Sequence, residues 1–518
     1  MIKTVLVSLL GLIVVAAGLI ATARLIFTLP PNGQRTVSAA MAPSPAAPLS
    51  AAVTDLSQAH PDQTGVYALI NGIDAFAARM LLAGRAKASI DVQYYIWHDD
   101  LTGTLLLNAL KQAAARGVRV RLLLDDNGVS GLDAQLAALD QLENFEVRLF
   151  NPFVIRRFKL LNYAFDFFRL NHRMHNKSFT VDNAASVIGG RNVGDEYFGT
   201  GPNSTFLDLD VLAIGAVVPA VSADFDRYWA SAAAYPVAAI VGDASGGLAA
   251  LDATYQRVAK TEQFSEYRAA LEASPLVTRL LDRTLRLEWT NVTLVSDDPD
   301  KVLGKARRED LMISRLTSLI GSPSKTLDIV SAYFVPGQIG ADQLTALERA
   351  GVKVRIMTNS FEATDVAVVH SGYAKYREEL LEAGLELYEL KARGAPGMGR
   401  GELGLMGSSG SSLHAKTFSI DGRQVFVGSF NFDPRSALLN TEMGLMIDSE
   451  MLARGVTDLF DSGLAGICYR PELKEGAMTW SDIGEDGKPQ VHDVEPGTTF
   501  VSRAMVTVAG WLPVEWLL

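Results

Sequence analysis

The stretch His175-Asn-Lys177-Ser-Phe-Thr-Val-Asp182 and its second copy, His414-Ala-Lys416-Thr-Phe-Ser-Ile-Asp421, decide the fold of this chain. Both copies read His-x-Lys-x-x-x-x-Asp. Alternate residues of an extended strand share a face, so the histidine and the lysine of each copy point to the same side. Asp182-Asn183 and Asp421-Gly422 are turn dipeptides, and each precedes a second hydrophobic run. Each copy therefore predicts a β-hairpin with an imidazole and an ammonium group on one face.

Each hairpin leads to a further polar side chain, because its return strand ends in Gly189-Gly-Arg-Asn192 or Gly428-Ser-Phe-Asn431. An imidazole can attack phosphorus or transfer a proton near neutral pH. Lysine ammonium and asparagine amide groups stabilise the negative charge on the non-bridging oxygens of a phosphate ester. The alternative is a pair of core hairpins with one structural histidine each. Two matches at equivalent places favour phosphate-ester chemistry, which requires no metal at such a site.

The sequence around the two motifs is also repeated, at a separation of roughly 240 residues. Ile90-Asp-Val-Gln-Tyr-Tyr-Ile-Trp97 and Leu327-Asp-Ile-Val-Ser-Ala-Tyr-Phe334 are typical of buried strands. Each is followed by a helical pattern, a glycine and another hydrophobic strand, which is the order of a βαβ unit. The repeat predicts one α/β lobe used twice, over residues 65–285 and 286–470, with a C-terminal tail over 471–518.

The N-terminal segment is hydrophobic, and residues 5–23 carry no charge. This length is just enough to cross the hydrocarbon core of a bilayer as a helix. A cleaved signal peptide is the alternative, because Ala21-Thr22-Ala23 has a small-x-small pattern. The apolar run resumes at Leu25-Ile-Phe27, which favours an uncleaved transmembrane anchor within residues 1–28. Residues 29–64 are rich in Ala, Pro and Ser, which is typical of a flexible linker.

Composition narrows the classes of function. Among 518 residues there is one cysteine, which excludes a disulfide within the chain and any cysteine-built zinc or iron–sulfur site. The formal net charge of −11 disfavours non-specific binding to nucleic acid, which relies on a broad basic surface. We therefore expect no cofactor, no metal and no nucleic-acid partner.

The doubled motif with its trailing Gly-x-x-Asn resembles the signature of the phospholipase D superfamily. Further stretches are similar to its bacterial cardiolipin synthase branch, most of all to the C type, over residues 65–470. These stretches are Tyr94–Trp97, Gly190–Phe198, Asn431–Ser436, Arg173–Phe179, Asp208–Val211 and Leu413–Phe418. The resemblance implies two pseudo-symmetric phospholipase D-like α/β/α sandwich lobes with the active site between them, after an N-terminal transmembrane helix.

The resemblance also implies roles for individual residues. In this family an acidic residue after each motif orients the histidine ring, and Asp208 and Glu442 match those places, with Asp210 as a competitor of Asp208. Lobe one has Gly190 where lobe two has Ser429, so the two halves are not equivalent. The implied catalytic residues are His175, His414, Lys177, Lys416, Asp208 and Glu442; the implied phosphate-binding residues are Asn192, Asn431, Ser429, Lys177 and Lys416; Asp182 and Asp421 are structural.

These features predict a membrane-bound phosphatidyltransferase of the bacterial inner membrane with a single N-terminal anchor. It forms cardiolipin from phosphatidylglycerol and a second phospholipid, which is phosphatidylglycerol or phosphatidylethanolamine. His175 is the expected nucleophile, giving a phosphatidyl-histidine, and His414 the acid and base, although the two histidines can exchange these roles. The alternatives are a hydrolase that releases phosphatidic acid, a phosphodiesterase or nuclease of the same superfamily, and a scaffold that binds lipid without turnover.

Three segments bear on a lipid substrate. Residues 151–177 mix basic and aromatic side chains, which favours contact with anionic headgroups over a packed helix with a solvated basic edge. The tail contains Trp511 and Trp516, so it either docks on the bilayer or caps a lobe. The glycine-rich residues 393–412 predict a mobile loop or lid beside His414.

Overall fold

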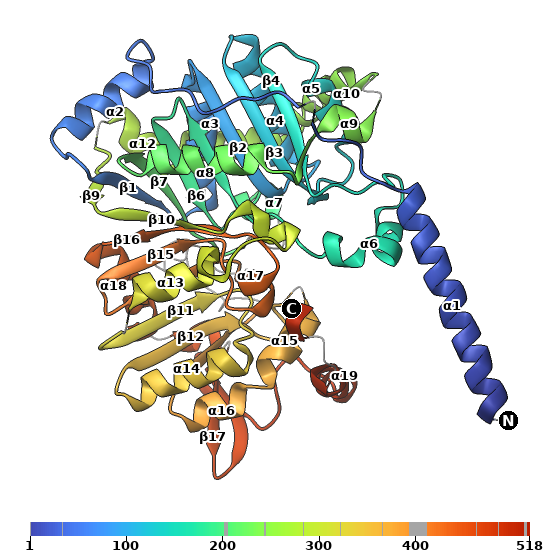
Figure 1. Cartoon of the computed structure of the whole chain (residues 1–518). Helices are drawn as coiled ribbons and strands as arrows, with labels where there is room; N and C mark the ends of the chain where they lie inside the picture. The colour runs from blue at the N-terminus through green and yellow to red at the C-terminus, as the bar shows by residue number, and fades with distance from the viewer. Residues whose placement is uncertain are drawn as a thin grey trace.

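Two β-sheets with matching strand orders form the body of the molecule in the computed structural model (Figure 1). The structure describes residues 2–33, 35–200, 206–242, 245–282, 284–321, 323–364, 366–392, 412–462, 464–484, 486–511 and 515–517. The first sheet runs in the order β8 (Ala234–Pro236), β4 (Phe145–Phe150), β3 (Arg119–Gly128), β2 (Ser89–Ile96), β5 (Ser178–Val181), β6 (Ala185–Gly189), β7 (Asp210–Gly215), β1 (Thr64–Leu69) and β9 (Glu288–Thr290).

The second sheet repeats this order and then continues past it. It runs β10 (Val292–Ser296), β16 (Met443–Ile447), β15 (Gln424–Gly428), β14 (Lys416–Ile420), β11 (Thr326–Ser331), β12 (Lys353–Asn359), β13 (Glu386–Leu390), β17 (Cys468–Lys474), β18 (Ala477–Ile483) and β19 (Pro489–His492). In each sheet three central strands are parallel, β2–β3–β4 and β11–β12–β13, and the motif hairpin pairs antiparallel with the first of them. The predicted duplication is confirmed as a duplicated topology.

Helices cover both faces of each sheet, because the central strands are hydrophobic on both sides. In β3, Leu122 and Leu124 pack with α3 and α4, whereas Leu123 packs with α8 on the opposite face. The helices of the first lobe are α3 (Gly72–Arg85), α4 (Leu101–Ala115), α5 (Asp133–Leu139), η1 (Lys159–Asn162), α6 (Tyr163–Leu170), α7 (Asp195–Phe198), α8 (Val218–Ala230), α9 (Val237–Val241), α10 (Gly247–Val258), α11 (Glu262–Glu272) and α12 (Pro275–Leu281). The first lobe is therefore the expected α/β/α sandwich.

The second lobe has the same three layers. Its β12 residue Ile356 packs with α13 and α14, and the adjacent Met357 packs with α18 on the other face. The helices of this lobe are η2 (Pro299–Leu303), η3 (Arg308–Asp310), α13 (Met312–Ile320), α14 (Gly337–Arg349), α15 (Ala367–Ala374), α16 (Arg377–Glu382), α17 (Pro434–Leu438), α18 (Glu450–Asp461), η5 (Leu464–Gly466), α19 (Phe500–Trp511) and η6 (Glu515–Leu517).

One hydrophobic core joins the two lobes. Val211 and Ile188 of the first sheet lie in the same buried cluster as Val427 and Leu445 of the second. All four side chains are at most 1% exposed. Because this core is continuous, the ends of the motif hairpins are held in a fixed relation across the lobe boundary.

The aspartate that ends each motif fastens its hairpin to the neighbouring strand. Asp182 and Asp421 occupy the left-handed region, with φ of 52° and 53°. The Asp182 carboxylate accepts hydrogen bonds from the three backbone N–H groups of residues 87–89, at the start of β2. The Asp421 carboxylate does the same for residues 324–326, at the start of β11. These contacts are structural.

The chain before and after the lobes is more ordered than its composition predicts. Residues 48–58, inside the predicted linker, form helix α2 (Pro48–Gln58), which begins at a proline and buries Val53 against Ile214. Strand β9 pairs with β1 of the first sheet, although it follows the expected lobe boundary at 285/286. The predicted tail contributes most of β17, all of β18 and all of β19 to the second sheet.

Helix α1 (Ile2–Ile26) projects from the body of the molecule (Figure 1). Its segment Thr4–Ile26 has a mean hydropathy of 2.7, and none of the most apolar window is buried by the protein. Among the described residues it is the one helix long and apolar enough to cross a membrane. A side chain placed this way in water would expose a large apolar area, which a bilayer removes.

Candidate active site

The two lobes exchange backbone hydrogen bonds at the motif histidines. The His175 N–H donates to the Thr441 carbonyl at 2.8 Å, and the Thr441 N–H donates to the Arg173 carbonyl at 2.9 Å. In the symmetry-related place the His414 N–H donates to the Leu207 carbonyl at 2.8 Å. Each motif therefore lies alongside the segment of the other lobe that carries the predicted carboxylate.

This arrangement crosses the histidine–carboxylate pairs between the lobes. His175 Nδ1 is 2.8 Å from Oε2 of Glu442, and His414 Nδ1 is 2.6 Å from Oδ2 of Asp208. The sequence identified both carboxylates from the lobe in which each follows a motif, whereas each one contacts the histidine of the opposite lobe. Asp210, the competitor of Asp208, instead forms an ion pair with Arg79 at 2.9 Å.

The hydrogen bonds select one tautomer for each histidine. An ionised carboxylate only accepts, so Nδ1 carries the proton and Nε2 keeps its lone pair. The side chains of His175 and His414 are 9% and 13% exposed, whereas those of Glu442 and Asp208 are 0% and 1% exposed. The carboxylates are thus sealed inside the protein, and the rings form the accessible part of each pair.

The two carboxylates differ in proton affinity. Burial raises the pKa of Glu442 to about 7, against the opposing effects of the Lys177 charge and the hydrogen bond from Ser429. Burial would also raise the pKa of Asp208, but the hydrogen bond and charge of His414 and the charge of Lys416 lower it to about 2. Asp208 is consequently ionised over the whole neutral range, while Glu442 titrates within it.

Both imidazoles hold protons weakly in the free protein. Burial, followed by the charge of Lys416, lowers the pKa of His414 to about 4, although Asp208 opposes the shift. Burial lowers the pKa of His175 well below its usual value, and the charges of Lys177, Lys416 and His414 add to the effect. These charge effects show that the two histidines and two lysines form one cluster across the lobe boundary.

Each motif lysine is buried beside its own histidine. Lys177 Nζ donates to the His175 carbonyl at 2.6 Å, and Lys416 Nζ donates to the His414 carbonyl. Their exposed fractions are 1% and 2%. Burial lowers the pKa of Lys177 well below its usual value, with the charge of Glu442 opposing the shift. A phosphate anion in this cluster would compensate the buried positive charge.

The predicted phosphate-binding side chains differ in how fully they are used by the protein. Asn192 accepts a hydrogen bond from the Ile96 N–H at 3.2 Å and donates one to the Tyr197 hydroxyl at 3.0 Å. Asn431 is 5% exposed, and its side-chain oxygen has no hydrogen-bond partner. Ser429 is fully buried and donates to the Glu442 carboxylate, so it positions Glu442 from behind.

The glycine at position 190 has a steric cause. A Cβ added there would lie 2.1 Å from Oδ1 of Asp208, so any side chain would displace that carboxylate. In the second lobe the equivalent Ser429 has room and supplies a hydroxyl to Glu442. The inequality between Gly190 and Ser429 therefore gives the two carboxylates different hydrogen-bond partners.

Aromatic rings that the sequence did not single out pack against the histidines. The Tyr95 ring lies edge-on to His175 with centroids 5.0 Å apart, and Lys177 Nζ is 5.7 Å from the same ring. His414 contacts Tyr197 at 5.1 Å and Phe206 at 5.2 Å. Tyr95 and Tyr197 belong to stretches quoted for the family resemblance, but their alignment with the imidazoles depends on the fold.

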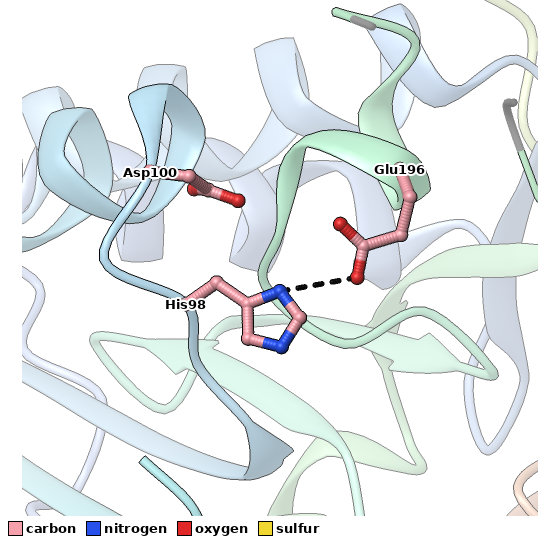
Figure 2. Close-up of side chains that lie close together, drawn as sticks. All are labelled: His98, Asp100 and Glu196. Atoms are coloured by element: carbon pink, nitrogen blue, oxygen red, sulfur yellow. Dashed lines mark ion pairs between the residues drawn. The ribbon is translucent and has the colours of Figure 1, made fainter. Parts of the chain in front are cut away.

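One further cluster has the donor set of a metal site. His98, Asp100 and Glu196 place a ligand atom each within 4.8 Å of one another (Figure 2). Asp100 already accepts from the N–H of Gly103 at 2.9 Å and from that of Asp195 at 2.7 Å, and His98 Nδ1 is 3.2 Å from Glu196. These bonds fasten α7, which carries Tyr197, to the start of α4.

The basic side chains of residues 151–177 are mostly paired inside the protein. Arg156 and Lys159 form ion pairs with Asp126, and Arg173 forms one with Asp125 at 2.9 Å. The expectation that these charges face anionic headgroups is wrong for these three residues, because their acidic partners follow β3 and lie outside the segment. The glycine-rich stretch 393–411, predicted as a loop or lid, lies outside the described residues.

Comparisons with known proteins agree with the geometry. A family model described as cardiolipin synthase, phospholipase D-like domain, matches residues 82–229 and 316–464, one match in each lobe. Cardiolipin synthase C of Escherichia coli K12 is 50% identical over 91% of this chain and 99% of that protein. A cardiolipin synthase of Listeria monocytogenes is 25% identical over 80% of this chain and 72% of that protein.

A solved structure shares the fold at low identity. The crystal structure of phosphatidylserine synthase from Haemophilus influenzae matches with a TM-score of 0.56 and 13% identity, over 90% of this chain and all of that one. The two-lobed arrangement is therefore found in an experimental structure of similar length.

Proposed function

This chain belongs to the phospholipase D-like cardiolipin synthase family and is a phosphatidyltransferase that forms cardiolipin, and we propose that His175 and His414 carry the transfer. The observation that supports this most is the crossed pairing of the two histidines with Glu442 and Asp208. Each lobe alone contains a histidine without its carboxylate. A complete pair requires both lobes, which suits a reaction with one nucleophile and one acid–base group.

In the first step, Nε2 of His175 attacks the phosphorus of the donor phospholipid. The bond from phosphorus to the headgroup oxygen breaks, and His414 gives its proton to that oxygen, which leaves as an alcohol. The donor is phosphatidylglycerol, which releases glycerol, or phosphatidylethanolamine, which releases ethanolamine. The product on the protein is a phosphatidyl-histidine, whose phosphate oxygens lie among Lys177, Lys416 and Asn431.

In the second step, a headgroup hydroxyl of phosphatidylglycerol gives its proton to Nε2 of His414. The resulting oxygen nucleophile attacks phosphorus, the bond to His175 breaks, and cardiolipin leaves. His414 then holds the proton that the next leaving group requires. The low exposure of both rings supports transfer to an alcohol over transfer to water.

The charges of the two carboxylates favour this division of roles. Asp208, with a pKa of about 2, stays ionised and stabilises an imidazolium on His414. Glu442, with a pKa of about 7, is a weaker stabiliser of a charged His175. A proton taken up together with the anionic phosphodiester therefore belongs on His414, which leaves the His175 lone pair available for attack.

We propose that α1 anchors the protein in the bacterial inner membrane, where its phospholipid substrates are. The apolar segment Thr4–Ile26 and the family of the chain support this location. Extraction of membranes with alkaline carbonate should leave the full chain in the pellet. Recovery of the intact chain in the soluble fraction would contradict the anchor.

A product assay tests the proposed reaction. Purified full-length protein is incubated in mixed micelles with labelled phosphatidylglycerol, with and without phosphatidylethanolamine. We expect labelled cardiolipin, released glycerol or ethanolamine according to the donor, and loss of product in His175→Ala. Phosphatidic acid as the only product would replace the synthase with a hydrolase, and an unchanged rate in His175→Ala would overturn the mechanism.

A further inference from the structure

We propose that exposed apolar residues of η1, α6, α17, α19 and η6 form one surface that is embedded in a phospholipid monolayer beside the catalytic cluster. We call this surface the apolar face. The inference rests on the proposed anchoring by α1. The residues of the face are Phe158, Leu160, Leu161, Phe168, Leu438, Phe500, Val501, Met505, Val508, Trp511 and Trp516, each at least 44% exposed.

The bilayer meets one end of this face, because the anchor ends against α6. Arg24 in the last turn of α1 donates from Nε to the Phe165 carbonyl at 2.6 Å. The ring of Phe27 stacks on that of Phe165 with centroids 5.5 Å apart. A helix that leaves the membrane at Arg24 therefore brings α6, with the exposed Phe168, to the level of the lipid headgroups (Figure 1).

The separate pieces of the face are joined by specific contacts. Arg435 at the start of α17 donates to Asn171, which caps α6, and to the carbonyl of Leu517 in η6. Glu515 of η6 accepts from Lys375 and Tyr376, which follow α15, and α19 packs against α15. These elements lie on the side of the molecule towards α1 in Figure 1.

The same elements lead directly to the catalytic residues. Helix α6 ends at Leu170, shortly before His175. Helix α17 lies between Asn431 and Glu442, and its exposed Leu438 extends the face towards them. A lipid held in a monolayer at this face would have its phosphate close to the histidines while its acyl chains stayed in an apolar medium.

Apolar contact is the main attraction that the face offers. Lys159 and Arg169 beside it are paired with Asp126 and Asp166, which leaves little charge for anionic headgroups. The two exposed tryptophans at positions 511 and 516 suit the membrane interface, where an apolar ring and a polar N–H are both accommodated. A phospholipid monolayer therefore fits this surface better than a polyanion.

Single-cysteine labelling of the full chain tests the proposal. The native Cys468 is 1% exposed, and burial raises the pKa of its thiol, so it will not compete for the label. Variants Leu160→Cys, Phe168→Cys and Met505→Cys sample the face. Ile339→Cys and Met451→Cys are matched controls, because these apolar residues are 74% and 64% exposed on α14 and α18. Each labelled protein is reconstituted into phosphatidylglycerol–phosphatidylethanolamine vesicles with an environment-sensitive fluorophore.

We expect a blue shift, loss of quenching by aqueous iodide and strong quenching by lipids with a shallow nitroxide for the three face labels, at a depth of roughly 5–10 Å. The two control labels should remain in water. The pattern should persist when salt is raised, since the attraction is apolar. Equal iodide quenching of face and control labels would overturn the proposal. Protection that grows with the protein-to-lipid ratio would assign the face to a second copy of the chain.

Cardiolipin formation in mixed micelles, measured on every labelled variant, separates this inference from the proposed function. Wild-type rates show that the variants are folded and that a negative labelling result speaks against the face alone. If the unlabelled protein makes no cardiolipin in micelles, the proposed function fails, while the labelling pattern still decides whether the face enters lipid.

Discussion

Replacement of Asp208 by asparagine probes the asymmetry of the two histidine–carboxylate pairs. The substitution keeps the shape of the side chain and removes the charge 2.6 Å from His414 Nδ1. A hydrogen bond to a charged group contributes about 1.5–3 kcal/mol, and about 1.4 kcal/mol corresponds to a tenfold change in rate. We therefore expect kcat for cardiolipin formation to fall roughly 10- to 150-fold.

The pH dependence distinguishes Asp208 from Glu442. Asp208 has a pKa of about 2, so Asp208→Asn should reduce the rate by a constant factor from pH 6 to pH 8.5. Glu442 has a pKa of about 7 and is largely protonated at pH 6, where Glu442→Gln removes little charge. The Glu442→Gln defect should therefore be small at pH 6 and grow as pH rises through 7.

Initial rates in mixed micelles across this pH range provide the assay. Asp252→Asn is a matched control, because this carboxylate is paired with Lys111 on the surface, far in function from the histidines. The control should keep the wild-type rate at every pH. A wild-type rate in Asp208→Asn, or identical pH profiles for Asp208→Asn and Glu442→Gln, would refute the reasoning.

Other substitutions have distinct expected effects. Asp182→Ala should lower the free energy of unfolding by about 2–4 kcal/mol in denaturant titrations, and Asp421→Ala by less, because Asp182 is the more deeply buried; equal losses would contradict this. Gly190→Ala should abolish most activity while the protein stays folded by circular dichroism, because its Cβ would displace Asp208; a normal rate would be inconsistent with that contact. Tyr197→Phe should reduce kcat by up to about tenfold through loss of one hydrogen bond, and a larger loss than for Tyr197→Ala would count against a positioning role.

The local features of the fold could be predicted from the sequence because they depend on neighbouring residues. The motif hairpins follow from strand alternation and from the turn residues Asp182 and Asp421, and the α/β repeat follows from the glycines that end its helices. The positive φ angles at Gly117 and Gly351 confirm this reasoning, since they are 87° and 90°. The identity of the carboxylates could also be inferred, but through the family resemblance.

The features that could not be predicted depend on how distant segments meet. The crossed pairing of Glu442 with His175 arises when the lobes stack, and a reading of each lobe alone gives the opposite pairing. Likewise Arg156 looks unpaired within its own segment, while its partners Asp126 and Asp133 come from the preceding part of the chain. Helix α2 lacks a strong periodic pattern, and it is stabilised by burial of Val53 against the first lobe.

The central claim is that the phosphatidyl group passes through His175. The most direct measurement is mass spectrometry of the peptide that contains His175, after brief incubation with phosphatidylglycerol and digestion at neutral pH. We predict a phosphatidyl adduct on His175 that disappears on a chase with unlabelled phosphatidylglycerol as cardiolipin forms, and that is absent in His175→Ala. An adduct on His414 with His175 unmodified, or cardiolipin formation by His175→Ala, would contradict the account.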